Sequence, residues 1–349
     1  MHRRDFLRPR HLAQSAGQLL GALDEITRTE ERPASSDAAL VRCARQAMAT
    51  TFEVLLPFGL PGAVDMAEAA LDEIDRLEEQ LTVYRASSEM SRINRDAAER
   101  AVPVEERLFE LLQHCARISE ETEGAFDITA GPLIKAWGFF RRQGRVPSEE
   151  ERAEVLRRVG MRHVTLDPEA RTVRFLQPGV EMNLGSIGKG YALDRTVETL
   201  RKRWNLRSGL LHGGHSSVYA IGSEPGGRRG WPVGVRHPWE PKRRLAVVRL
   251  RDQGLATSAA TFQHLEYNNR KLGHILDPRT AWPAEGVASA TVLAPTAAEA
   301  DALATAFFIL GVDKAREYCA AHPDVGALLL PAGEAARPVL LGNSLALEE

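Results

Sequence analysis

A glycine-rich segment of the chain has the composition of a phosphate-binding turn. Residues 183–194 read Asn-Leu-Gly-Ser-Ile-Gly-Lys-Gly-Tyr-Ala-Leu-Asp, with three glycines within six residues at the start of a predicted helix. Glycine lets the backbone approach a ligand closely, a helix N-terminus offers free N–H groups to phosphate, and Lys189 adds a positive charge. The segment matches neither the dinucleotide-binding nor the Walker A pattern. It therefore predicts either a diphosphate cradle or a tight turn that carries a surface lysine.

A carboxylate and a hydroxyl lie four residues apart in an apolar segment of the C-terminal part. Asp301 and Thr305 fall on one face of a helix predicted over 297–310, which is otherwise rich in alanine, leucine and phenylalanine. Oxygen ligands of this kind suit a hard cation such as Mg²⁺. The alternative is that Asp301 caps or pairs near the start of the helix, where acidic residues are favoured. Spacing alone leaves both interpretations open.

Two further segments have residue types that suit a binding site. Residues 272–280 read Leu-Gly-His-Ile-Leu-Asp-Pro-Arg-Thr, which is typical of a strand that ends in a structured turn. His274 titrates near neutrality and is able to move a proton, although a lone histidine is more often structural. Asp277 has the alternative role of organising the turn. Residues 124–140 carry little charge and several aromatic rings, which predicts either the lining of a flat ligand or a core turn.

Bulk composition excludes several classes of protein. The 349 residues are 44% hydrophobic and carry a formal charge of −2, so nothing draws the whole chain to nucleic acid or to an anionic membrane. Cys43, Cys115 and Cys319 are far apart and lack a CxxC spacing, which predicts packing residues rather than disulfides or a zinc site. No apolar run approaches the length of about 20 residues that a transmembrane helix needs.

The N-terminal residues 1–41 are polar and irregular, and they are predicted to form a leader with some helix over 12–27. Residues 3–7 read Arg-Arg-Asp-Phe-Leu and match the core of a twin-arginine export signal. The residues that follow are too polar for the apolar region of a signal peptide. The N-terminus therefore favours a cytoplasmic protein, with export as the alternative.

Hydrophobic periodicity predicts a mixed fold after the leader, organised as a single domain over 42–349. Antiparallel-looking hairpins stand beside helices, which favours an α+β fold over a parallel doubly wound sheet. Helices are predicted over 62–81, 104–122, 148–159, 189–204 and 297–310, the last as the closing element. Strands are predicted over 52–56, 164–166, 172–175, 210–212, 217–221, 232–236, 245–250 and 289–294.

Taken together, the order and spacing of the segments resemble the ApbE-type FAD:protein FMN transferases. The resemblance covers residues 42–325. The matching blocks are, in chain order, Met48-Ala49-Thr50, Leu81 to Tyr84, Ser87 to Asn94, Phe126 to Thr129, Gly131 to Leu133, Trp137 to Phe139, Gly185 to Asp194, Gly213-Gly214, Thr257-Ser258, His274 to Thr280 and Asp301 to Thr305.

The resemblance implies a fold and an activity. The expected fold is ApbE-like, with two interleaved α/β subdomains, a mostly antiparallel sheet and FAD in the cleft between them. The expected reaction is Mg²⁺-dependent transfer of FMN from FAD to a Thr or Ser hydroxyl of an acceptor protein through a phosphoester bond, with release of AMP. The alternatives are an FAD diphosphatase that uses water as the nucleophile and a non-catalytic FAD-binding protein. Nucleic acid is not an expected partner.

The resemblance also implies roles for individual residues. Asp301 and Thr305 would be metal ligands, together with the backbone carbonyl of Ser186. Asp301 and His274 would be catalytic, with His274 acting in proton transfer. The FAD site is expected to comprise Met48, Tyr84, Ala125, Phe126, Asp127, Asn183, Lys189, His274 and Ile275.

Five positions depart from the family pattern. Ala49, Ala259 and Ala281 each stand where the family commonly has glycine. Asn183 replaces an aspartate, which removes a charge but keeps the ability to hydrogen-bond, and His215 replaces an asparagine. If the glycine that Ala281 replaces had a positive φ angle, alanine would carry a conformational cost there. The departures at His215, Ala259 and Ala281 cluster in the C-terminal half and bear more on transfer to the acceptor than on FAD binding.

Overall fold

The computed structural model describes residues 39–141, 144–240, 242–259, 264–267, 270–333 and 336–342. The predictions made for the leader, including the export motif and the helix over 12–27, lie outside the described residues. The chain divides into two compact units, Met1–Asp37 and Ala38–Glu349, and every described residue belongs to the second unit. Its first strand begins at Leu40, two residues before the predicted domain start.

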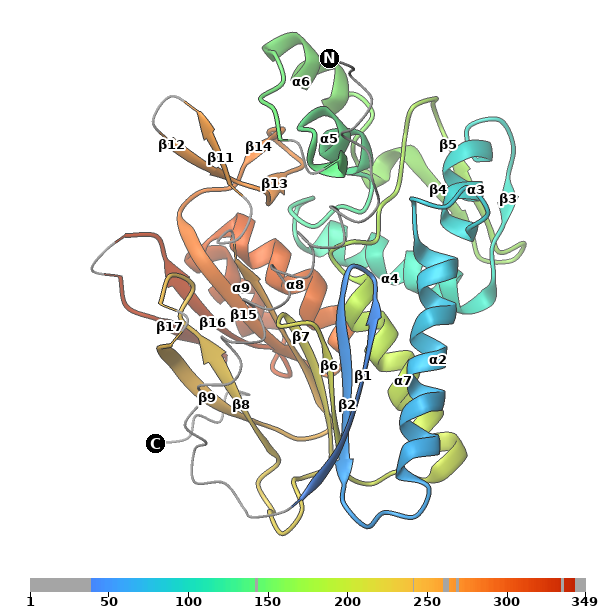
Figure 1. Ribbon diagram of the computed structural model, residues 1–349. Helices are drawn as coiled ribbons and strands as arrows, with labels where there is room; N and C mark the ends of the chain where they lie inside the picture. The colour runs from blue at the N-terminus through green and yellow to red at the C-terminus, as the bar shows by residue number, and fades with distance from the viewer. Residues whose placement is uncertain are drawn as a thin grey trace, which may run out of the picture. The chain divides into compact units, whose positions relative to one another are not determined.

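An antiparallel sheet of eight strands forms the centre of this unit, and its strand order follows the chain order (Figure 1). Every neighbouring pair is antiparallel. The inner strand β15 is buried along its whole length, because both faces of the sheet are covered. In sheet order the strands are β1 (Leu40–Ala47), β2 (Thr50–Pro57), β6 (Gly209–Gly213), β7 (Ser217–Ile221), β10 (Gln253–Ala259), β15 (Val287–Ala294), β16 (Gly326–Pro331) and β17 (Val339–Leu341).

Helices cover one face of the sheet. They are α2 (Ala63–Leu81), α7 (Gly188–Trp204) and α8 (Ala297–Leu310), flanked by α4 (Glu106–Glu121) and α9 (Val312–Ala321). The first residue of α8, Ala297, lies against α7 at Gly190, where an added Cβ would fall 2.1 Å from the Ala297 carbonyl oxygen. Glycine at position 190 therefore lets the two helices approach closely. Thr296 caps α8 by accepting a hydrogen bond from the Glu299 amide at 3.1 Å.

A two-stranded hairpin covers the other face of the sheet. It consists of β8 (Trp231–Arg236) and β9 (Arg244–Leu250). Alternate residues of the hairpin, such as Trp231 and Val248, pack against Leu255 and Leu293 of the sheet in a second hydrophobic core. Figure 1 shows this hairpin at the lower left, away from α2 and α7.

A third core lies beside one end of the sheet, around the buried ring of Trp137. It is built by α5 (Gly131–Ala136), α6 (Glu149–Leu156), β12 (Arg270–Gly273), β13 (Leu276–Asp277) and β14 (Trp282–Pro283), with β11 (His264–Tyr267) paired to β12. The remaining described elements are α3 (Glu89–Asp96), β3 (Val102–Pro103), β4 (Val164–Asp167), β5 (Thr172–Phe175) and the short helices η1 (Phe139–Arg141) and η2 (Met161–His163).

The structure confirms the α+β prediction and the five predicted helices, each within three residues of its predicted ends. The prediction that 297–310 closes the chain is wrong, because α9, β16 and β17 follow it. Strands β1 and β10 were not predicted. Cys43 is half-buried, while Cys115 and Cys319 are buried, and all three are free thiols. Among the described residues, no helix is both long and apolar enough to cross a membrane.

Candidate functional site

Asp301 is a buried carboxylate on which three elements of the fold converge. Its Oδ2 accepts a hydrogen bond from the Gly190 amide at 2.9 Å and lies 3.4 Å from Nζ of Lys189, both on the first turn of α7. Its Oδ1 accepts a hydrogen bond from the buried hydroxyl of Ser217 at the start of β7, at 2.8 Å. The glycine-rich segment and the C-terminal carboxylate, which the sequence identified separately, therefore meet.

Thr305 lies one helical turn after Asp301 on α8, as the spacing predicts. Its hydroxyl is 3.3 Å from the Asp301 carbonyl oxygen and 3.2 Å from the hydroxyl of Ser258 on β10. Ser258 therefore adds another oxygen to the same helix face. Asp301, Thr305 and Ser258 together present the hard oxygen donors that Mg²⁺ prefers.

The start of α7 leaves a backbone carbonyl available beside these oxygens. In a regular helix the Gly190 amide would donate to the Ser186 carbonyl four residues earlier. Here that amide donates to Asp301, while the next amide, of Tyr191, donates to Ile187. The Ser186 carbonyl thus stands outside the hydrogen-bond ladder of α7, which fits its expected role as a metal ligand.

The donor set fits a cation that keeps other ligands of its own. Among the residues that the structure describes, no group of three or more His, Cys, Asp and Glu side chains is placed to hold a metal. Mg²⁺ commonly takes one or two carboxylates and completes its shell with water and substrate phosphates. This coordination preference is matched by the Asp301 carboxylate, the Thr305 hydroxyl and the Ser186 carbonyl, which lie beside a helix N-terminus suited to phosphate.

Asp194 fixes the position of α8 against α7. Its two carboxylate oxygens accept hydrogen bonds from the amides of Ala297 and Ala298, each at 2.8 Å. Burial raises the pKa of Asp194 to about 7, against the effect of these two hydrogen bonds. The carboxylate thus satisfies two free N–H groups at the start of α8 and holds in place the helix that carries Asp301.

Asn183 organises the turn that precedes α7. Its Oδ1 accepts a hydrogen bond from the Gly185 amide at 2.8 Å, and its own amide donates to the Ile128 carbonyl at 2.7 Å. The preceding residue, Met182, is held by a pair of 2.8 Å bonds between its backbone and the side chain of Asn94. The amide at position 183 therefore keeps the turn closed without a carboxylate.

The segment from Ala125 to Asp127 is held inside the protein. The side chains of Ala125 and Phe126 are fully buried. The Asp127 carboxylate accepts hydrogen bonds from Thr129, through its amide at 2.8 Å and its hydroxyl at 2.6 Å, and from the Met161 amide at 3.0 Å. Burial raises the pKa of Asp127 despite these bonds. These side chains are therefore held inside the protein by packing and by hydrogen bonds.

A cavity of about 250 Å³ lies next to Asn183. It is lined by Phe140, Lys135 and Arg95, among others. The exposed ring of Tyr84 stacks on Phe140 with ring centroids 4.6 Å apart. The adjacent ring, Phe139, packs on Trp137 in the third core, as the core-turn alternative for residues 124–140 expects. The aromatic lining of this cavity is thus Phe140, reinforced by Tyr84.

The turn between β1 and β2 brings Met48 to the same region. Met48 and Ala49 have φ angles of 48° and 60°, the left-handed values of a two-residue type I′ turn. The Gly214 amide donates to Thr51 at 2.9 Å, and a Cβ on Gly214 would fall 2.3 Å from the Thr50 hydroxyl. The turn therefore packs on the glycine pair that leads into Ser217.

His274 and Ile275 lie between β12 and β13, both half-buried. Asp277 accepts hydrogen bonds from the amide and the guanidinium of Arg279, each at 2.9 Å or less, which supports its turn-organising role. Ala281 is fully buried with a φ angle of 56°, so the conformational cost anticipated for alanine at this position is present. Its carbonyl accepts a hydrogen bond from the Trp137 indole at 3.1 Å.

Several residues of the site were missed by sequence reasoning. Ser217 had no signal of its own, because its partner Asp301 is 84 positions away. Phe140 and Lys135 lay inside the segment 124–140 but were not singled out within it. Asn94 and Ser258 stood inside blocks that resemble the family, and their roles emerge from contacts with Met182 and Thr305.

Comparison with known proteins agrees with this geometry. The sequence model of the ApbE family matches residues 48–329. The FAD:protein FMN transferase of Escherichia coli strain K12 is 30% identical over 262 residues, covering 73% of this chain and 74% of the relative. The enzyme of the same name from Haemophilus influenzae is 33% identical over 258 residues, covering 72% and 73%.

Solved structures show the same fold. The ApbE protein of Thermotoga maritima superposes with a TM-score of 0.78 at 28% identity, covering 87% of this chain and 97% of that one. The apo form of the flavinyl transferase ApbE of Pseudomonas stutzeri gives a TM-score of 0.76 at 25% identity, covering 87% and 95%. With the sequence match spanning the glycine-rich turn, Asp301 and Thr305, the chain belongs to the ApbE family.

Proposed function

We propose that this chain is a flavin transferase that moves FMN from FAD to a Thr or Ser hydroxyl of an acceptor protein and releases AMP. The observation that carries the proposal is the convergence on Asp301 of Lys189, Gly190 and Ser217. A cation-binding carboxylate beside a cationic helix N-terminus is an arrangement suited to a diphosphate. The names of the relatives, FAD:protein FMN transferase, support the same activity.

The metal would be held by Asp301, Thr305 and the Ser186 carbonyl. When bound there, Mg²⁺ would neutralise charge on the diphosphate and favour the departure of AMP. Lys189 contacts Asp301 from the side of the α7 N-terminus, and its ammonium is placed to serve phosphate oxygens as well. In this proposal the Asp301 carboxylate binds the cation and the Lys189 ammonium binds the phosphate.

The transfer itself is chiefly a matter of position and charge. The acceptor oxygen forms a bond to the flavin-side phosphorus, and the bond from that phosphorus to the bridging oxygen breaks, so AMP leaves with the bridging oxygen. The hydroxyl proton passes to a base, for which we propose the imidazole of His274. The flavin ring would lie by the stacked pair Tyr84 and Phe140, next to the cavity that Asn183 lines.

The test uses the purified chain with FAD, Mg²⁺ and a soluble protein domain that accepts FMN from the Escherichia coli relative. We expect the acceptor to gain the mass of one FMN, with AMP formed in equal amount, and we expect EDTA to stop both. An acceptor whose flavinylated Thr is changed to Val is the matched control. FMN and AMP released without a modified acceptor would establish a diphosphatase instead. FAD that stays intact would establish a binding protein.

A further inference from the structure

The β8–β9 hairpin is strongly basic although the chain as a whole is not. Residues 225–251 contain seven arginines and one lysine against one glutamate, a formal charge of +7, whereas the whole chain carries −2. Some of these charges face carboxylates: Arg249 lies 2.6 Å from Glu224, Arg243 3.0 Å from Glu240 and Arg251 3.9 Å from Asp252. The hairpin therefore concentrates positive charge in a protein that is otherwise balanced.

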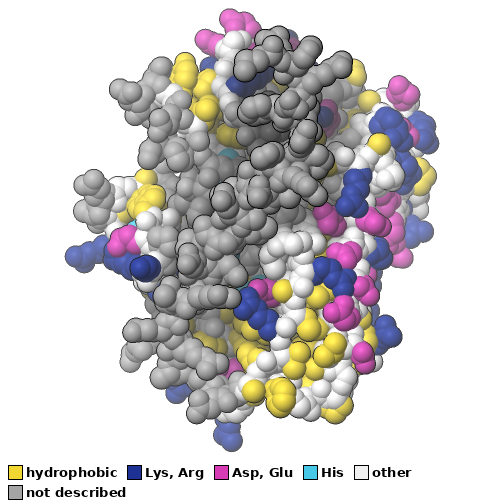
Figure 2. Space-filling model, in the orientation of Figure 1, with side chains coloured by type: hydrophobic (Ala, Val, Ile, Leu, Met, Phe, Trp, Pro, Cys, Tyr) yellow, Lys and Arg dark blue, Asp and Glu magenta, His cyan; other side chains and the backbone are white. Residues whose placement is uncertain are grey.

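The positive charge is divided between the two ends of the hairpin. Arg236, Lys242, Arg243 and Arg244 lie at or beside its turn, whereas Arg228, Arg229 and Arg251 lie at its other end. Trp231, Val233 and Val235 point inward to the second core, so the residues between them point outward. Arg236 pairs across the hairpin with Arg244, whose side chain passes over Gly234, where an added Cβ would be 3.4 Å from Cδ. Lys242, Arg243 and Arg244 are all exposed at the turn. Figure 2 shows Lys and Arg side chains gathered at the left edge, at the level of this turn in Figure 1.

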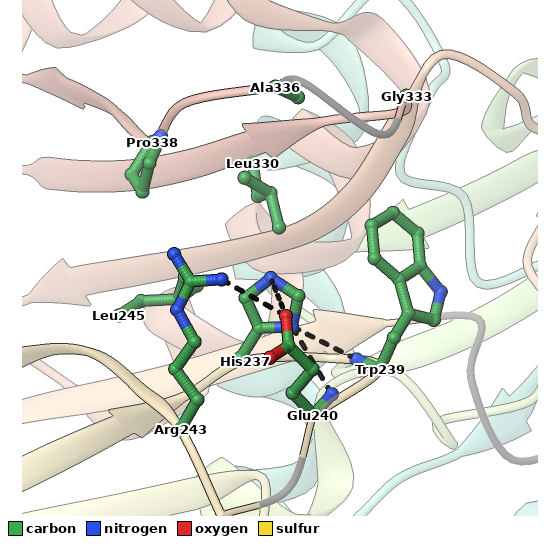
Figure 3. A pocket seen from close by; sticks show the side chains of 9 residues that line it. All are labelled: His237, Trp239, Glu240, Arg243, Leu245, Leu330, Gly333, Ala336 and Pro338. Carbon is green, nitrogen blue, oxygen red and sulfur yellow. Dashed lines mark hydrogen bonds and ion pairs between the residues drawn. The ribbon is translucent and has the colours of Figure 1, made fainter.

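A cavity of about 550 Å³ opens beside the turn (Figure 3). The indole of Trp239 stands at one side and the guanidinium of Arg243 at the other, with Leu330 and Pro338 facing them. Trp239 is 53% exposed, which is unusual for so large an apolar ring. The cavity thus combines an exposed aromatic wall with positive charge at its rim.

The exposed indole is held in place by its neighbours. Nδ1 of His237 accepts hydrogen bonds from the amides of Trp239 at 3.3 Å and Glu240 at 3.2 Å. The His237 and Trp239 rings meet edge to face with centroids 5.8 Å apart. Glu240 is engaged by Arg243 at 3.0 Å, so the acidic residue of the turn is already neutralised. A pre-ordered aromatic side chain loses little conformational entropy when a partner binds.

The cavity lies at the same end of the sheet as the site. Leu330, on its wall, pairs with Ser289, which pairs in turn with Ala259, the residue after Ser258. Two strand spacings separate Leu330 from Ala259, about 10 Å. Leu330 lies on the same face of the sheet as Leu328, which packs in the second core under the hairpin. Ser258 contacts Thr305 and therefore lies on the opposite face, which the helices cover. The cavity and Thr305 therefore lie at the same end of the sheet but on its opposite faces.

We propose that the turn of the β8–β9 hairpin, with its cavity, docks an acidic segment of the acceptor protein and places an apolar side chain of that segment against Trp239. This rests on the proposed function. A protein acceptor must approach the end of the sheet that lies beside Asp301 and Thr305 of α8. The basic hairpin turn at the same end would attract an acidic segment of that acceptor. A second copy of this chain, docking through its acidic helix α2, is the competing occupant.

The decisive experiment compares two variants with a matched control. Lys242→Ser/Arg244→Ser removes two exposed charges of the turn, and Trp239→Ala removes the aromatic wall. Lys202→Ser/Arg203→Ser removes the same charge from the far end of α7, away from Lys189. The probe is the acceptor domain used above, chosen so that it carries an acidic segment next to its flavinylated Thr. Acceptor KM and kcat are measured at low and high salt, and acceptor binding is titrated separately without FAD. The Kd for FAD and the circular dichroism spectrum verify the fold of each variant.

We expect both hairpin variants to raise the acceptor KM and the acceptor Kd by on the order of tenfold, with kcat and the Kd for FAD unchanged. High salt should weaken wild-type binding and have less effect on the double charge variant. The α7 control should behave like wild type. Transfer with an unchanged KM in both hairpin variants would overturn the docking proposal while the proposed function stands.

The same measurements can also support docking while refuting the proposed function. Acceptor binding that depends on the hairpin, without any FMN transfer by the wild-type chain, would support docking and refute the proposed function. Sedimentation of the chain alone tests the competing occupant. If the hairpin variants altered self-association and left acceptor binding intact, the partner would be a second copy and our proposal would be wrong.

Discussion

The Ser217 hydroxyl donates to Oδ1 of Asp301 at 2.8 Å, so the first residue of β7 orients a carboxylate that stands 84 positions later on α8. The other oxygen of Asp301 faces the Gly190 amide and the Lys189 ammonium. Both oxygens are thereby fixed in direction by the protein itself, ahead of the cation that we propose they bind. A ligand held in this way loses little freedom on coordination, which is how surrounding hydrogen bonds tune a metal site.

Asp301→Asn should abolish Mg²⁺-dependent transfer. The change keeps the shape of the side chain but removes the charged ligand, so we expect FMN transfer to fall by about 100-fold or more. An amide NH₂ in place of one oxygen would face a donor, which should also lower the free energy of unfolding by about 1–3 kcal/mol. Mass analysis of the acceptor and urea denaturation measure the two effects.

Glu299→Gln on the first turn of the same helix is the control for Asp301→Asn. It removes one charge at the surface side of α8 and should leave transfer intact. Full Mg²⁺-dependent transfer by Asp301→Asn would show that this carboxylate is not a metal ligand.

His274→Ala should separate binding from transfer. If the imidazole takes the acceptor proton, the variant should bind FAD with an unchanged Kd and transfer FMN about 100-fold more slowly. Fluorescence titration of FAD and single-turnover transfer give the two quantities. Loss of FAD binding would instead make His274 a binding residue.

Ala49→Gly should stabilise the protein. Ala49 is exposed with a φ angle of 60°, a conformation in which Cβ is strained and glycine is not. No packing is lost at an exposed methyl, so we expect the free energy of unfolding to rise by about 0.5–1 kcal/mol. Ala44→Gly on the neighbouring strand β1, also exposed, should lower it by a similar amount. Equal effects of the two substitutions would contradict the strain argument.

His212 should make stability depend on pH. Burial lowers the pKa of His212 to about 4, with Arg42 nearby acting in the same direction and Glu53 against it. An unfolded histidine titrates near 6.5, so between pH 4 and 6.5 the unfolded chain binds a proton that the folded chain does not. The free energy of unfolding should therefore fall as pH falls below about 6.5, by up to about 1.4 kcal/mol per pH unit.

The measurement is urea denaturation of wild type and His212→Gln at several pH values in that window. The variant should show a flatter dependence, because the group that takes up the proton is gone. His215→Gln, with an exposed side chain, should keep the wild-type slope. A wild-type slope in His212→Gln would assign the effect to other histidines.

Local pattern predicted much of the secondary structure. The helix over 297–310 is predicted to the residue, because Thr296 caps it and Gly311 ends it. Strand β10 was missed because Gln253 to Ala259 contains no run of large β-branched residues, and it exists through its pairing with β7 and β15. The hydrophobic pattern of a segment indicates which secondary structure that segment prefers by itself. Which strands pair with it is determined by the tertiary fold.

Candidate residues of the site were identifiable from the sequence where they belong to short blocks that resemble the family. Lys189 and Asp301 were both identified, yet their contact was not, since a distance across 112 positions has no local signature. The sequence left residues 124–140 open between lining a ligand and forming a core turn, and the short helix η1 turns Phe140 to the cavity and Phe139 to the core. Ala281 shows the reverse case, in which a departure from glycine correctly indicated a left-handed backbone.

The strand order of the central sheet has a consequence for how the protein is made. Each strand of the central sheet after β1 pairs with the sheet strand that comes before it in the chain, so none has to insert between two strands already joined. As the chain leaves the ribosome, the sheet can lengthen at one growing edge, in step with synthesis. Asp301 and Thr305 emerge after β15, so a nascent chain acquires the two residues proposed to bind a metal only when most of the sheet strands have been synthesised.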